Sequence, residues 1–156
     1  MFLIEDIIDL AIQVEKNGEK VYRDAADRVS DPRLSSMLRR LADEEMKHAK
    51  WFDELRHTAS KTAVDSKLEE MGKALLKEVL GDQSFSLKEA NFSKIDKIKD
   101  LIHIAIEFEK DTVLFYNLIR TFVQDREALH HLQAIIEEEN QHVKCLQDLL
   151  ESGDER

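Results

Sequence analysis

The sequence predicts an all-α fold, a four-helix bundle built from two repeated helical hairpins with a helical crossover segment. Three observations predict it. The 156 residues include only 4 Gly and 1 Pro, which disfavours turn-rich β-sandwiches and glycine-looped α/β folds. Apolar residues recur at alternating steps of 3 and 4, the spacing of one helix face. Residues 4–58 also align without a gap onto residues 98–152, and 16 of the 55 aligned positions are identical.

The first hairpin is predicted over residues 3–58. One apolar stripe ends near Val29, and a second begins after Pro32. Ser30 or Asp31 offers an oxygen that can cap the second helix, and the proline behind it needs no backbone donor at a first helical position. The stripes therefore predict two helices of about 25 residues each, joined by a short turn.

The second hairpin is predicted over residues 94–152, because the same stripes recur there. The crossover segment, residues 59–93, carries a further apolar stripe that predicts a shorter amphipathic helix at about 62–80. This segment either crosses along the bundle or packs across a dimer partner. We expect one domain over residues 1–156.

The chain is acidic, with 33 Asp and Glu against 23 Lys and Arg and a net charge of −10. Nucleic acid and anionic membrane surfaces require a basic face, so we expect neither as a partner. Acidic Glu5 and Asp6 interrupt the apolar N-terminal residues, which argues against a signal peptide. Cys145 is the only cysteine and cannot form an internal disulfide. A cytoplasmic location is therefore expected.

Six polar residues occupy positions on the stripes where core residues belong: Glu15, Glu45, His48, Glu109, Glu139 and His142. No Lys or Arg lies on the stripes to neutralise the glutamates. Burying one unpaired carboxylate costs several kcal/mol, so burying four would exceed the stability of a typical domain, about 5–15 kcal/mol. Something must therefore neutralise these side chains.

A lone Glu-x-x-His motif is weak evidence for a metal site. Here the motif occurs twice, as Glu45-Met-Lys-His48 and Glu139-Asn-Gln-His142, and each copy has a helix glutamate 30 residues upstream. One Glu from each of two helices plus Glu-x-x-His from two others is the di-metal carboxylate arrangement of helical bundles. Two divalent cations would balance four carboxylates, and protonation would do so in part. The alternative is a bundle that keeps these residues in exposed seams.

The ligand chemistry indicates which metals to expect. Carboxylates with imidazoles favour iron or manganese over calcium or magnesium, while zinc and copper also bind such ligands. We expect two iron ions, with manganese or zinc as alternatives. Glu45 and Glu139 are expected to bridge the ions, because each lies one turn from a His. Glu15 and Glu109 are expected to be terminal ligands.

Two tyrosines follow the upstream glutamates by seven residues. Tyr22 and Tyr116 are either core aromatics or groups that hydrogen-bond a ligand carboxylate or carry an electron. Glu44 and Glu138, which precede the motif glutamates, are either solvated or partners of the ligands. No other catalytic side chain is predicted.

With these motifs, the sequence resembles the rubrerythrin branch of the ferritin-like superfamily over residues 3–58 and 97–151. The resemblance rests on Ala-Ile-Gln-Val-Glu15-Lys-Asn-Gly18 running to Tyr22, Glu45-Met-Lys-His48, Ala-Ile-Glu-Phe-Glu109 running to Tyr116, and Glu139-Asn-Gln-His142. It implies a ferritin-like fold and an oxidoreductase that reduces hydrogen peroxide or dioxygen at a diferrous centre. Such a peroxidase would serve in oxidative stress.

Two departures qualify what the resemblance implies. Full rubrerythrins carry a rubredoxin domain with paired Cys-x-x-Cys motifs, which we do not expect here, so electrons would come from a separate donor protein. Rubrerythrins also have an extra carboxylate where this chain has Thr112, a position linked to redox-dependent ligand switching. The alternative functions are ferritin-like oxidation and sequestration of ferrous iron, or a non-catalytic metal-binding helical module. A homodimer is expected by likeness to relatives.

Overall fold

The computed structural model describes residues 4–58 and 98–153. Within these ranges the chain is all-α and contains no strand. The helices are α1 (Ile4–Arg28), α2 (Pro32–Thr58), α4 (Ile98–Arg120) and α5 (Arg126–Gly153). No described helix is both long and apolar enough to cross a membrane.

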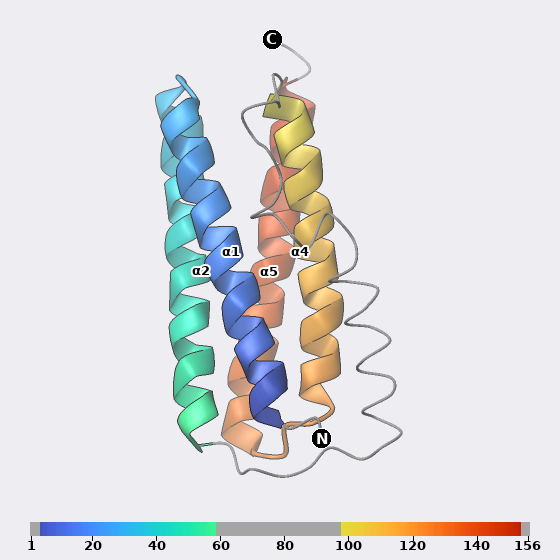
Figure 1. The fold of residues 1–156 in the computed structure, drawn as a ribbon. Coiled ribbons are helices and arrows are strands. Elements are labelled where there is room, and N and C mark those ends of the chain that lie inside the picture. Colours follow the sequence, from blue (N-terminus) through green and yellow to red (C-terminus); the bar gives the residue numbers. More distant parts are fainter. Residues whose placement is uncertain (1–3, 59–97, 154–156) are drawn as a thin grey trace. The chain divides into compact units, whose positions relative to one another are not determined.

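The chain divides into two compact units, Met1–Ala74 and Leu75–Arg156. The first contains the hairpin of α1 and α2, and the second contains the hairpin of α4 and α5 (Figure 1). Both predicted hairpins are therefore confirmed. The crossover segment 59–93, with its helix predicted at about 62–80, lies outside the described residues. The single domain over 1–156 stays a prediction.

A capping aspartate starts the second helix of each hairpin. The backbone N–H of Arg33 donates to Asp31 Oδ1 at 3.0 Å, and Pro32 takes the first helical position of α2. In the second hairpin, the N–H of Ala128 donates to Asp125 Oδ2 at 2.9 Å. Both carboxylates satisfy a backbone donor that has no partner within the helix. Of the two predicted caps, Asp31 fills this role.

The two hairpins differ in how their helices pack. In the first, small residues recur every seven positions on both helices, which we call the tight seam. It comprises Ala11, Gly18 and Ala25 on α1, and Ser35, Ala42 and Ala49 on α2. The hydroxyl of Ser35 donates directly to the carbonyl of Ala26 on the facing helix at 2.9 Å. Small contact residues permit a short distance between helix axes, and more of the backbone of α1 and α2 than of α4 and α5 lies within 8 Å of the facing helix.

The repeat-related positions of the second hairpin carry larger side chains and form what we call the wide seam. It comprises Ala105, Thr112 and Ile119 on α4, and Leu129, Ile136 and Val143 on α5. Phe108 and Phe115 of α4 are fully buried beside these positions, where α1 has Val14 and Val21. Larger side chains between two helices increase the distance between their axes, which agrees with the smaller share of α4 and α5 backbone within 8 Å of the facing helix.

Candidate metal centre

The first hairpin brings three of the predicted ligands together, and we call them the N-terminal triad: Glu15, Glu45 and His48. Glu15 lies on α1, while Glu45 and His48 lie one turn apart on α2. All three are buried, with the histidine only 3% exposed. His48 Nδ1 is 3.4 Å from Glu15 Oε1, and one ligand atom from each residue lies within 4.8 Å of the others.

The second hairpin builds the same arrangement, the C-terminal triad, from Glu109 on α4 and from Glu139 and His142 on α5. These residues are equally buried. His142 Nδ1 lies 3.6 Å from Glu109 Oε1 and 3.3 Å from Glu139 Oε2. Ligand atoms of the three residues again lie within 4.8 Å of one another. The repeat detected in the sequence therefore extends to side-chain geometry within each hairpin.

The distances within the triads fit shared coordination of an ion. Two ligand atoms that each lie about 2.1 Å from one metal, at angles of about 90–120°, are separated by about 3.0–3.6 Å. The three His–Glu separations given above fall in this range. A direct charge-assisted hydrogen bond would be shorter, about 2.7–2.9 Å.

The buried glutamates provide a second test of whether the triads suit a metal ion. Each triad places two carboxylates in a core whose described stripes contain no Lys or Arg. In all four glutamates Oε2 is buried and accepts no hydrogen bond, although each side chain makes other polar interactions. Desolvation of these charges is unfavourable unless a cation compensates them. Oxygen and imidazole donors suit iron, manganese or zinc.

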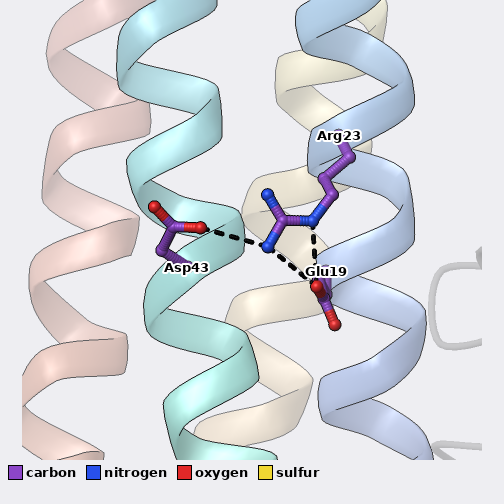
Figure 2. Close-up of polar contacts among 3 residues, drawn as sticks. All are labelled: Glu19, Arg23 and Asp43. Carbon is purple, nitrogen blue, oxygen red and sulfur yellow. Dashed lines mark hydrogen bonds and ion pairs between the residues drawn. The ribbon is translucent and has the colours of Figure 1, made fainter.

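An ion cluster that sequence reasoning missed joins α1 to α2 (Figure 2). Arg23 donates through Nε to Glu19 Oε2 at 2.9 Å on its own helix, and its Nη2 reaches Asp43 Oδ1 of α2 at 3.1 Å. These hydrogen bonds, with Glu19 contributing most, raise the pKa of Arg23. Glu19 follows Glu15 by one turn. The repeat concealed the cluster, because Glu19 aligns with Val113.

Other sequence predictions can be placed as well. Tyr22 and Tyr116 are buried in their respective hairpins, as both of their predicted roles require. Thr112 is fully buried, and its hydroxyl donates to the carbonyl of Phe108 at 2.8 Å. Four histidines outside the triads are exposed: His57, His103, His130 and His131.

The remaining predictions concern three side chains. Glu44 is half-buried and Glu138 is exposed, and both have polar interactions. Cys145 is half-buried, next to fully buried Leu146.

Comparison with known proteins agrees with this architecture. A family model described as Rubrerythrin matches residues 6–150. The chain is also similar to the crystal structure of a proposed ferritin-like diiron-carboxylate protein from Thermotoga maritima, with a TM-score of 0.75 and 23% identity over 97% of each chain. No curated protein matched. The structural likeness confirms the predicted all-α, ferritin-like four-helix fold class.

Proposed function

The chain belongs to the rubrerythrin family, and from this premise we propose that its two triads hold two iron ions at which hydrogen peroxide or dioxygen is reduced. The observation that carries the proposal is the duplicated, buried Glu–Glu–His set. Four carboxylates balance two divalent ions, and the imidazoles complete a donor set that suits iron.

The residues of this chain would perform three tasks. The four glutamates, Glu15, Glu45, Glu109 and Glu139, would bind and orient the ions and balance their charge in a water-poor core. His48 and His142 would each offer a ring nitrogen that must be free of a proton to bind metal. Tyr22 and Tyr116 are proposed to orient a ligand carboxylate through the phenol hydroxyl.

When bound, two ferrous ions supply the two electrons that, with two protons, convert hydrogen peroxide into two water molecules. The electrons must then be restored, and we propose a separate electron-donor protein for this step. A homodimeric state and a cytoplasmic location also remain proposals. None of these partners is needed for a single turnover of reduced protein, so the first test can omit them.

The experiment combines metal analysis with rapid kinetics. We expect about two irons per chain, as the paired Glu-x-x-His arrangement implies, and oxidation of the diferrous protein by peroxide faster than oxidation of free ferrous ion. His142→Ala should lower both the iron content and the rate. His103→Ala, an exposed histidine on α4, is the matched control and should change neither.

Two outcomes would redirect the proposal. Oxidation no faster than that of free ferrous ion would contradict peroxide reduction. Loading well beyond two irons per chain would favour ferritin-like oxidation and sequestration instead. A metal-loaded protein that reacts with neither oxidant would leave the non-catalytic metal-binding module as the function.

A further inference from the structure

We propose that the two triads are not equivalent: the N-terminal triad is preorganised and takes the first metal ion, whereas the C-terminal triad binds its ion more weakly and exchanges it. This inference rests on the proposed function, because it requires that both triads bind metal. It concerns the order and strength of binding, which identical donor sets do not by themselves distinguish.

The tight seam is the first reason. Gly18 is buried in the interior of α1, three residues after Glu15, and in antiparallel order it lies at the level of Ala42. Glycine is unfavourable inside a helix relative to alanine, so this position indicates close approach of the facing backbone. A short distance between α1 and α2 restricts where the Glu15 carboxylate can lie relative to Glu45 and His48.

Ion pairs along the same two helices are the second reason. Arg23 pairs with Asp43 at 3.1 Å. Arg39 pairs with Asp27 at 2.6 Å, and Arg56 pairs with Asp9 at 2.7 Å. Each exposed pair contributes little alone. Together they fix the register of α1 against α2 at three levels, of which Arg23–Asp43 is the nearest in sequence to the triad.

The second hairpin cannot form these three ion pairs at the equivalent positions. The positions equivalent to the six charged partners are His103, Asn117, Thr121, Gln133, Glu137 and Leu150, which include no Lys or Arg. The cross-helix bond that the structure shows there joins neutral Gln133 to Arg120 at 2.6 Å. With larger side chains between α4 and α5, the C-terminal triad has more freedom before metal binds.

Local charge does not account for the expected difference. Glu19, Arg23 and Asp43 sum to a net charge of −1, and the equivalent residues Val113, Asn117 and Glu137 also sum to −1. Closer to the ligands, Glu107 and Asp111 of the second hairpin occupy the positions of neutral Gln13 and Asn17 in the first, so charge favours cation binding at the C-terminal triad and opposes the expected order. Preorganisation is the remaining explanation for tighter binding at the N-terminal triad, because a site whose ligands are already held loses less conformational freedom when the metal binds.

The test is a titration of the metal-free full chain with Co²⁺, whose visible absorption reports coordination. We expect two steps whose affinities differ by about tenfold or more, the scale on which supporting contacts alter metal affinity. His48→Ala should abolish the tight step. His142→Ala should abolish the weak step and leave the tight one. The repeat makes these two variants matched controls for each other.

A second comparison tests the seam itself. Gly18→Val should weaken the tight step by about tenfold and leave the weak step unchanged. Ala25→Val adds bulk to the same seam, ten residues from Glu15, and should lower the melting temperature of the metal-free protein without weakening the tight step. Gly18→Ala is the smaller change to use if the valine variant does not fold.

The outcomes separate this inference from the proposed function. Two ions bound in one indistinguishable step, or a tight step lost in His142→Ala but kept in His48→Ala, would overturn the inference while the di-metal function survived. Equal weakening of the tight step by Gly18→Val and Ala25→Val would also overturn it. Absence of Co²⁺ and iron binding in the wild-type chain would refute both.

Discussion

The two hairpins carry the same ligands on different scaffolds. Each presents Glu, Glu and His at repeat-related positions, buried to the same degree. Around them, the first hairpin packs small residues and ties its helices with ion pairs, whereas the second packs isoleucine and phenylalanine. The comparison teaches that the donor set constrains three positions per hairpin, while many packings can support it.

Removing the metal should produce the largest effect, because both triads then keep buried charge without its counter-ions. With metal at about a thousandfold above its dissociation constant, binding stabilises the folded state by about 4 kcal/mol. For a chain of this size, chelation should therefore lower the melting temperature by roughly 8–16 °C. Calorimetry with and without chelator measures the shift, and an unchanged midpoint would contradict metal-linked stability.

A larger side chain in the tight seam should have the second-largest effect on stability. Ala42→Ile introduces the side chain found at the equivalent position 136, and overpacking of this kind costs about 1–3 kcal/mol. Ile136→Leu conserves volume in the wide seam and should cost less than about 1.5 kcal/mol. Denaturant unfolding of both variants measures the difference. Equal tolerance in the two hairpins would remove the distinction between the seams.

Helix capping should affect the hairpins alike. Asp31→Ala and Asp125→Ala each remove the acceptor for one backbone N–H at the start of α2 or α5. Each should cost about 1 kcal/mol of unfolding free energy. Asp→Asn at the same positions retains a capping oxygen and should cost less. A large difference between the two alanine variants would show that the same capping hydrogen bond contributes unequally to the unfolding free energy of the two hairpins.

The smallest effect should come from the exposed ion pairs that join α1 to α2. Arg39→Gln breaks the pair with Asp27 and should cost about 0.2–1 kcal/mol, decreasing as salt screens the interaction. Arg120→Gln in the second hairpin removes a charge that bonds a neutral glutamine, so its cost should depend less on salt. Thermal melts at low and high salt measure both variants.

Much of the site could be predicted because glutamate and histidine on an apolar stripe conflict with burial. That conflict, repeated at a constant offset, identified all six triad residues before any coordinates. The helix boundaries near Val29 and Pro32 could be predicted because one apolar stripe ends and the next begins there, with residues that can cap a helix between them. The Arg23 cluster could not be found by the same reasoning, since exposed charges are ordinary on a helix and only the facing helix selects which of them pair.

The tight seam could be predicted from the sequence only in part. Ala11, Gly18 and Ala25 recur every seven residues, but small residues on an apolar stripe also occur without close packing. Close packing requires small residues on the facing helix as well, and α2 supplies them with Ser35, Ala42 and Ala49 in matching order. The hydrogen bond from Ser35 to the carbonyl of Ala26 shows this contact at the turn end of the hairpin.

The sequence by itself determined the helical class, the duplicated hairpin and the identity of the buried donors, because helix periodicity and the cost of burying charge are local or statistical properties of the chain. Tertiary structure decided how near each pair of helices lies and which exposed charges meet across it. Those outcomes depend on the side chains that two helices contribute at the same contact. The volume available there is set by both helices together and cannot be read from the sequence of either one.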